Sequence, residues 1–436
     1  MARQQHKSTG EKSQPDAAAP SADTAPLLGR RRLLRLGVLL LLLAALIWKR
    51  DAWLPQLVHP RVRAALADRQ PDVALKWLDR LDTVVDGDPE SAFLRARAYR
   101  KQGDMEQVRV WLQKALDRGL DPERVRREEW LAYAQSGQMQ QAERHLPQLL
   151  TSPEQDVTEV YDAFVTGYIR TYRLPKARRL LEAWIENEPD SPRPHLLLGQ
   201  VCQILQQHEM AAEEFRSAIE LNPDDPAPWL HLGDTLLSHE RPDEAADAYR
   251  SYLNSDNPTD AASARLGLAI ALRMAGDLQA AEQILKSLDE NQPPNAEVKT
   301  ELGRLAFEAG NSEAAIRYLQ EALELKPFLI EARYMLAQSL VETGRRKEAA
   351  VHFEKVEQGR AARARIATLR DDLGARPDDV ELRFEIATLS HEFDAPGEAM
   401  IWYQSVLALD PDHQGALQAL NEHHQSRSEP DATISD

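Results

Sequence analysis

Two helical segments joined by a short polar turn recur along this chain with a period of 34 residues. Residues 195–223 contain one such unit, marked by Leu198, Gly199, Ala211, Phe215, Ala218 and Pro223. The marks return as Leu232, Gly233, Ala245 and Tyr249, as Leu268, Ala269, Ala281, Leu285 and Pro293, and as Leu302, Gly303, Ala315, Leu319, Ala322 and Pro327. Recurrence at a fixed period predicts a chain that grows by stacking similar units and has no single core.

Each mark has a packing role that explains why it recurs. Gly199 lets the second helix approach the first closely, and Ala211 and Ala218 are small where the helices cross. Phe215 fills the space between neighbouring units, and Pro223 ends the unit because proline lacks an N–H and disfavours helical geometry before it. The pattern resembles the tetratricopeptide repeat, which implies an all-α, right-handed solenoid of tandem helix-turn-helix units.

The units are expected to cover most of the chain. They begin near residues 55, 89, 123, 158, 192, 226, 262, 296 and 330 and fill 55–357. An extra helix or irregular linker is expected at 358–379, then a last unit at 380–413 and a capping helix at 414–425. The tails 1–29 and 426–436 are expected to be disordered. Glycines mark the turn between paired helices in five units, where a left-handed backbone costs glycine little: Gly103, Gly137, Gly276, Gly310 and Gly344.

Charge is distributed unevenly along the sequence. The net charge is −17, but residues 1–50 hold nine Lys/Arg against three Asp/Glu, which leaves −23 for residues 51–436. A repeat region this acidic is a poor binder of nucleic acid or anionic lipid, because phosphate contacts need clustered cations. We therefore expect protein or peptide partners and no nucleic acid.

Residues 30–50 carry a basic flank followed by an apolar run. Leu36 to Trp48 contains no charge, and its leucines, valine and isoleucine favour lipid by about 4 kcal/mol together. The run spans only about 20 Å as a helix against about 30 Å for a bilayer core, and snorkelling of Arg35 and Lys49 extends it to about 24 Å. We expect an uncleaved signal-anchor helix. A cleaved signal peptide is the alternative, although no small-x-small triplet follows the run.

The flanking charges bear on the orientation of this segment. Arg30, Arg31, Arg32 and Arg35 favour a cytoplasmic N-terminus, with the repeats outside the plasma (inner) membrane of a bacterium. Lys49, Arg50, Arg61 and Arg63 nearly match them on the other side. The block 30–35 also resembles the twin-arginine export motif, and an ordinary basic flank is the other reading.

The sequence offers no familiar catalytic or metal-binding motif. Cys202 is the single cysteine, so neither an intrachain disulfide nor a cysteine zinc site can form, and no phosphate-binding loop, His-Glu-x-x-His or nucleophile elbow occurs. We expect a non-catalytic scaffold without cofactor, metal or small-molecule substrate. An envelope-biogenesis or assembly factor that regulates a membrane-associated enzyme complex is the alternative. The relative with that role and a similar layout ends in a cysteine-pair metal module, which this chain cannot supply. An enzyme with an unrecognised site is the remaining possibility.

The resemblance implies that the first helices of the units line a concave groove. By register, the candidate partner-binding residues are Phe93, Arg97, Arg100, Lys101, Arg124, Arg127, Leu230, Leu237, Ile270, Arg304, Phe307 and Tyr334. The cations among residues 97–127 suggest an acidic peptide segment held by bidentate arginine contacts, or else a solvated basic face near the membrane. The apolar residues further along suggest an amphipathic helix or an extended strand, or else packing between successive first helices.

Overall fold

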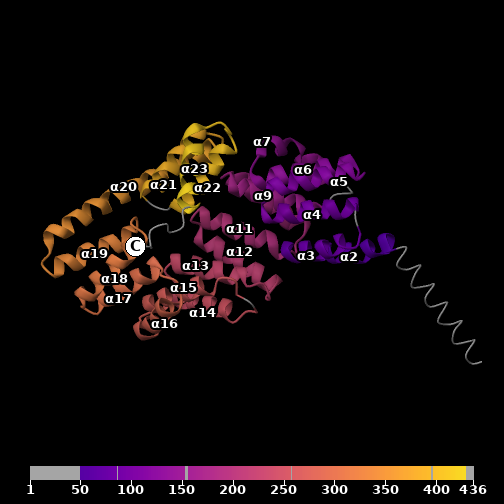
Figure 1. The fold of residues 1–436 in the computed structure, drawn as a ribbon. Helices are drawn as coiled ribbons and strands as arrows, with labels where there is room; N and C mark the ends of the chain where they lie inside the picture. The colour runs from indigo at the N-terminus through magenta and orange to yellow at the C-terminus, as the bar shows by residue number, and fades with distance from the viewer. Residues whose placement is uncertain (1–49, 86, 153–155, 257, 394–395, 429–436) are drawn as a thin grey trace, which may run out of the picture.

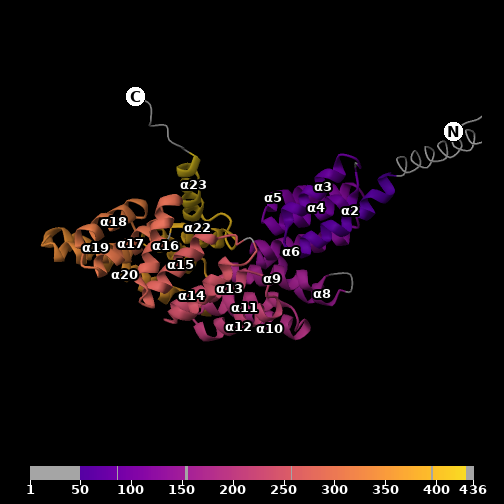
Figure 2. The same ribbon diagram turned by 90° about the horizontal axis from the view of Figure 1, so that it is seen from below.

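The computed structural model describes residues 50–428 apart from 86, 153–155, 257 and 394–395. Within this part the secondary structure is entirely helical, and the helices stand in antiparallel pairs along a curved stack (Figure 1). Figure 2 shows the same arc from below, with α2–α6 at one end and α17–α20 at the other. The expected disordered tail 1–29, nearly all of the expected anchor 30–50 and residues 429–436 lie outside the described residues. Among the described helices, none has the length and apolar composition that a membrane crossing needs.

The first helix of each pair begins close to the predicted unit boundary. These helices are α2 (Arg50–Ala67), α4 (Pro89–Gln102), α6 (Pro122–Ser136), α9 (Val157–Arg170), α11 (Pro192–Ile204), α13 (Ala227–Ser238), α15 (Ala261–Met274), α17 (Ala296–Glu308), α19 (Ile330–Glu342) and α21 (Val380–Phe393). The second helices are α3 (Pro71–Asp82), α5 (Met105–Asp117), α10 (Leu174–Asn187), α12 (His208–Leu221), α14 (Pro242–Leu253), α16 (Leu278–Asn291), α18 (Ser312–Leu325), α20 (Arg346–Ala375) and α22 (Pro396–Leu407). Helix α23 (Gln414–Ser428) follows the last pair, where a capping helix was expected.

The turn between paired helices uses a left-handed residue at one fixed position. The five predicted turn glycines have φ between +75° and +93°. Where glycine is absent, Arg69, Tyr172, Gln206 and Glu240 take the position with φ of +55° to +57°. A left-handed backbone costs a residue with a Cβ about 1–2 kcal/mol. In four units the turn therefore carries this energetic cost, and a side chain is present at the turn position.

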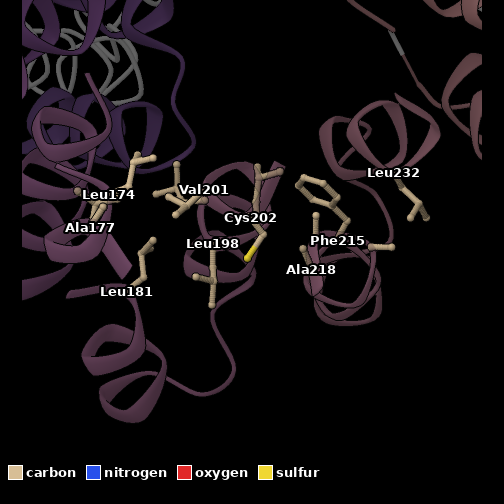
Figure 3. Packing of buried hydrophobic residues seen from close by; sticks show 14 of the residues in the cluster. Leu174, Ala177, Leu181, Leu198, Val201, Cys202, Phe215, Ala218 and Leu232 are labelled. Carbon is tan, nitrogen blue, oxygen red and sulfur yellow. The ribbon is translucent and has the colours of Figure 1, made fainter. Parts of the chain in front are cut away.

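Small residues and aromatic rings meet between helices as the repeat pattern predicts. A Cβ on Gly199 would lie 2.5 Å from Cε1 of Phe215, and a Cβ on Gly233 would lie 2.8 Å from Cε1 of Tyr249. Figure 3 shows side chains of successive helices filling one continuous core, including Leu181 from α10, Cys202 from α11 and Phe215 from α12. Cys202 is buried there and packs as a small apolar side chain.

Two units differ from the predicted pairs. The second helix of the third unit is broken into α7 (Met139–Ala142), a 3-10 turn η1 (Glu143–His145) and α8 (Leu146–Thr151). Pro147 explains the break, because it cannot donate the helical hydrogen bond. The extra helix expected at 358–379 is not a separate element. It continues α20 without interruption, since the buried stripe of Val356, Ile366, Leu369 and Leu373 runs on until Pro377.

Distant units of the stack also touch, which a simple stack does not require. The turn after α9 contacts the last repeat: Thr171 O accepts from Nη2 of the buried Arg383, and Arg173 pairs with Asp378. Arg170 Nη2 donates to Gln404 Oε1 at 3.2 Å, and the Tyr172 and Trp402 rings lie 5.3 Å apart. We call the contact between residues 169–173 and residues 378–405 the closure. In Figure 1 it brings α22 beside α9 and α11.

Candidate functional site

The first helices form the inner side of the curved stack. Successive first helices contact one another directly, as α4 does α6, α6 does α9, α13 does α15 and α17 does α19. In a bent stack the elements on the inside have the shorter arc and lie closest together. The predicted groove residues therefore belong to the inner face.

A network of buried ion pairs occupies the inner face between α4 and α9. Arg100 is fully buried, with Nε 2.5 Å from Glu128 Oε1 and Nη2 2.7 Å from Glu159 Oε2. Arg97 lies 3.7 Å from Glu128 and 3.5 Å from Glu159. Lys101 Nζ is 2.9 Å from Glu159 Oε1. The three cations are thus shared by two carboxylates of the neighbouring first helices.

Asp162 extends this network towards both neighbouring parts of the stack. Its carboxylate pairs with Lys101 at 3.3 Å, with Arg193 at 3.2 Å and with Arg69. Five first helices or their turns therefore contribute to one set of charges. Such a network fixes the relative placement of the units, because each cation must find its acid in the next unit.

The pKa values in the network follow from burial and pairing. Burial raises the pKa of Glu159, but Arg100, Lys101 and Arg97 outweigh it and hold the pKa well below its usual value. Burial likewise raises the pKa of Asp162, and Arg193 and Arg69 lower it below its usual value. Burial lowers the pKa of Arg193 to about 10, and Arg69 adds to the effect. All of these groups stay charged at neutral pH.

The prediction that Arg100 presents its charge to an acidic partner is wrong. Arg100 has no exposed surface, and its charge is matched by carboxylates 28 and 59 residues away. Arg97 and Lys101 pair with the same acids. Withdrawing these cations to bind a peptide would leave buried carboxylates unpaired, which costs several kcal/mol.

The other predicted residues of this region also contact the chain itself. Phe93 is buried, and the guanidinium of Arg124 lies 4.7 Å from its ring centroid. Arg124 Nη1 pairs with Glu90 at 2.9 Å. Arg127 donates to the hydroxyl of Ser152 at 3.3 Å. These contacts tie α4 and α6 to each other and α6 to the residue that follows α8.

The predicted apolar residues further along remain partly exposed. Leu230 and Leu237 lie on α13, Ile270 on α15, Phe307 on α17 and Tyr334 on α19, each half-buried. Leu230, Leu237 and Phe307 also pack against the core. Part of each side chain is therefore covered by the chain itself and part faces solvent, and the reading of these residues as a partner-binding surface stays a prediction.

Arg304 and Tyr334 meet in one cavity on the inner face. The cavity has a volume of about 410 Å³, and Glu331, Arg360 and Arg363 contribute to its wall. Arg304 lies 3.2 Å from Glu301 and 3.3 Å from Glu331. The guanidinium of Arg360 lies 5.0 Å from the ring centroid of Tyr334. Two predicted residues from different units thus form one concave site.

The described residues show no group suited to hold a metal ion, that is, no three His, Cys, Asp or Glu side chains gathered together. The inner face is instead a surface of paired charges and half-buried apolar groups.

The comparison with known families agrees with this arrangement. Tetratricopeptide repeat profiles match residues 165–226, 205–260 and 230–296, and another matches residues 306–372. These segments are tetratricopeptide repeats. Tetratricopeptide repeats are generally protein-interaction scaffolds, because stacked units create an extended concave surface.

Several solved structures match parts of the chain at low identity. PilW, a widely conserved type IV pilus biogenesis factor, is 20% identical, covers 47% of this chain and 93% of its own, and has a TM-score of 0.43. PilF of Pseudomonas aeruginosa is 17% identical over 57% of this chain and 97% of its own, with a TM-score of 0.35. A tetratricopeptide repeat protein from Parabacteroides merdae is 15% identical over 58% of this chain and 98% of its own, with a TM-score of 0.40. No curated protein sequence matches the chain.

The residues of the closure were not identified from the repeat pattern. Tyr172 stands at a turn position where five other tetratricopeptide-like units have glycine, and this departure could have indicated a special role. The buried acids of the inner face also had a sequence signal. Glu128 follows Arg100 by 28 residues, close to one repeat, as expected for neighbouring sites on successive first helices.

Proposed function

We propose that this chain is a non-catalytic scaffold that holds a protein or peptide partner along the inner face of its tetratricopeptide repeats. The observation that carries the proposal is the row of half-buried apolar side chains from α13 to α19, which includes Ile270, Phe307 and Tyr334. Each residue comes from a different first helix. A partner helix or strand that follows this row would bury apolar surface in several units at once.

The partner's charge is proposed from the cavity around Arg304 and Tyr334. Arg304, Arg360 and Arg363 line it together with one acid, Glu331. Arg304 pairs with Glu301 and Glu331, and Arg360 pairs with Glu357. The Arg360 side chain is nevertheless 53% exposed, whereas that of Arg100 is fully buried. An acidic segment of the partner would therefore reach the cations here more easily than at residues 97–127. Arginine binds carboxylates in bidentate fashion, which favours a defined orientation of the partner.

The membrane tether is part of the proposal. Residues 30–50 would anchor the chain as a single-pass helix, with the N-terminus in the cytoplasm and the repeats outside a bacterial plasma membrane. Resistance of the full chain to extraction by alkaline carbonate would support the anchor. A C-terminal alkaline phosphatase fusion reports the side, since that enzyme is active only outside the cytoplasm. Release by carbonate or an inactive fusion would contradict the respective part.

Photo-cross-linking in cells tests the inner face directly. We expect benzoylphenylalanine at Ile270 or Phe307 of the full chain to give discrete adducts with a protein. The same group at Leu278, an exposed apolar residue at the start of the second helix α16, is the control and should give none. Adducts of equal strength at all three positions, or at Leu278 alone, would contradict partner binding on the inner face.

A further inference from the structure

A second cavity lies at the closure, apart from the inner-face cavity around Tyr334. Its volume is about 440 Å³, and it is lined by the ends of α9 and α11 on one side and by α20 and α22 on the other. The apolar part of the wall consists of Ile169, Tyr172, Ile204, Ile401 and Trp402. Residues 169–206 and 370–405 form this wall together, so the cavity exists only while the closure is intact.

Two isoleucines at this cavity are exposed beyond what packing requires. Ile204 is 39% exposed and Ile401 is 54% exposed, while Trp402 beside them is buried. Apolar side chains that line a concave site and remain open to solvent are typical of ligand pockets. The volume suits one or two side chains of a bound segment.

The polar groups of the wall leave positive charge unmatched. Arg170 and Arg370 line the cavity with a single acid, Glu398, which pairs with Arg370. Arg170 donates to an uncharged amide, that of Gln404. Nε of Arg370 is buried and has no hydrogen-bond partner in the described structure. Asp371 follows Arg370 on α20 but does not line the cavity. A carboxylate entering here would find a net positive charge.

The turn residues support a built site rather than an accidental gap. Tyr172 and Gln206 line the cavity, and both hold the left-handed turn position that glycine takes in five units. Both residues keep a strained backbone conformation, and their side chains form part of the cavity wall. The amide of Gln206 offers both a donor and an acceptor, the two groups that a peptide backbone needs.

We infer that the closure cavity binds a peptide segment of a partner protein in which a large apolar side chain stands next to a carboxylate. The apolar side chain would lie between Ile204 and Ile401, and the carboxylate would accept from Arg370 and Arg170. The site shares no lining residue with the inner-face cavity around Tyr334, so it adds a second contact for a protein partner.

Selection from a random library tests the inference without knowledge of the partner. Phage-displayed dodecapeptides are panned on the full chain in detergent and counter-panned on the Ile401→Glu variant. We expect enriched peptides to carry a large apolar residue within two positions of Asp or Glu. In fluorescence anisotropy, they should bind the wild type at least tenfold more tightly than Ile401→Glu or Arg370→Gln.

The control variant is Val351→Glu, because Val351 is 55% exposed on α20 and does not line the cavity. It should bind the selected peptides like the wild type. Absence of enrichment over Ile401→Glu, enrichment of basic peptides, or equal loss in Val351→Glu would each overturn the inference. So would binding of dodecanoic acid, but no peptide, at the cavity. Unchanged cross-linking at Ile270 in Ile401→Glu would show that the inner-face function stands independently of this result.

Discussion

Replacing Arg383 by methionine tests whether the closure belongs to the folded protein. Arg383 is fully buried in the last repeat, where Nη1 donates to the hydroxyl of Ser405 and Nη2 to the carbonyls of Thr171 and Pro377. Only the bond to Thr171 crosses between distant units. Burial, with a smaller effect of Arg173, lowers the pKa of Arg383 to about 10, so the side chain is still protonated at neutral pH.

The size of the effect follows from the acceptors that lose their donor. Each buried polar group left without a partner costs about 1–3 kcal/mol, and two carbonyls are affected. Methionine fills most of the arginine's volume and removes a desolvated charge, which offsets part of the loss. We expect the free energy of unfolding to fall by about 2–4 kcal/mol, with the last repeat released from residues 170–173 first.

Two measurements follow the change. Small-angle X-ray scattering of the full chain in detergent should show a larger radius of gyration than the wild type. Hydrogen exchange should become faster for amides in residues 380–407. Arg376→Met is the matched control, because Arg376 is exposed and, within the part of the chain that the structure describes, pairs with Asp379 alone, at 3.0 Å. Its loss should cost at most about 1 kcal/mol. An Arg383→Met chain with wild-type scattering and exchange would refute the structural role assigned to the closure.

Three further predictions concern the repeats themselves. Gly233→Leu should lower the free energy of unfolding by roughly 1–3 kcal/mol, because the larger side chain overpacks against Tyr249. Gly374→Ala should not destabilise the chain, because an added Cβ at Gly374 meets nothing within 4 Å. Equal melting temperatures of the two variants would show that the packing register is mistaken. Arg100→Gln should cost about 3–5 kcal/mol by leaving two buried glutamates without their main partner, and a loss under about 1 kcal/mol in urea unfolding would mean that the network is solvated. Burial raises the pKa of Asp88, but hydrogen bonds from His59 and from Ser91 outweigh it and lower the pKa from 3.8 to about 2. Because the folded-state pKa of Asp88 is depressed, the stability that its ionised carboxylate contributes is present above pH 4 and lost as pH falls towards 2. The difference in the free energy of urea unfolding between wild type and Asp88→Asn should therefore shrink over that range. A constant difference would contradict this prediction.

The repeats could be recognised in the sequence because the interactions that define them are local. A turn glycine such as Gly103 is required by backbone geometry within one unit, and Gly199 is required by contact with Phe215 sixteen residues later. Both constraints act within a single helix pair. They therefore leave a residue pattern at a fixed spacing, which the sequence alone can display.

Whether a charged side chain is buried or exposed was harder to predict from the sequence, because the residues that surround it belong to other units. Arg100 has the same register position as a solvent-facing groove residue, yet carboxylates on α6 and α9 enclose it. A charge is buried or exposed according to how closely those helices approach, and that distance depends on packing across three units. The sequence could supply the cations and the acids but not their distances.

The amino-acid sequence by itself determined that the chain is a series of paired helices, where each turn falls, and which small and aromatic residues join the pairs. The tertiary structure decided that Tyr172 meets Trp402 and that Arg383 reaches Thr171, 212 residues away. These contacts of the closure depend on the sum of the small rotations between successive units and on the continuous helix α20, which leads into the last unit. No single unit contains the sum, so only the assembled stack reveals the closure and its cavity.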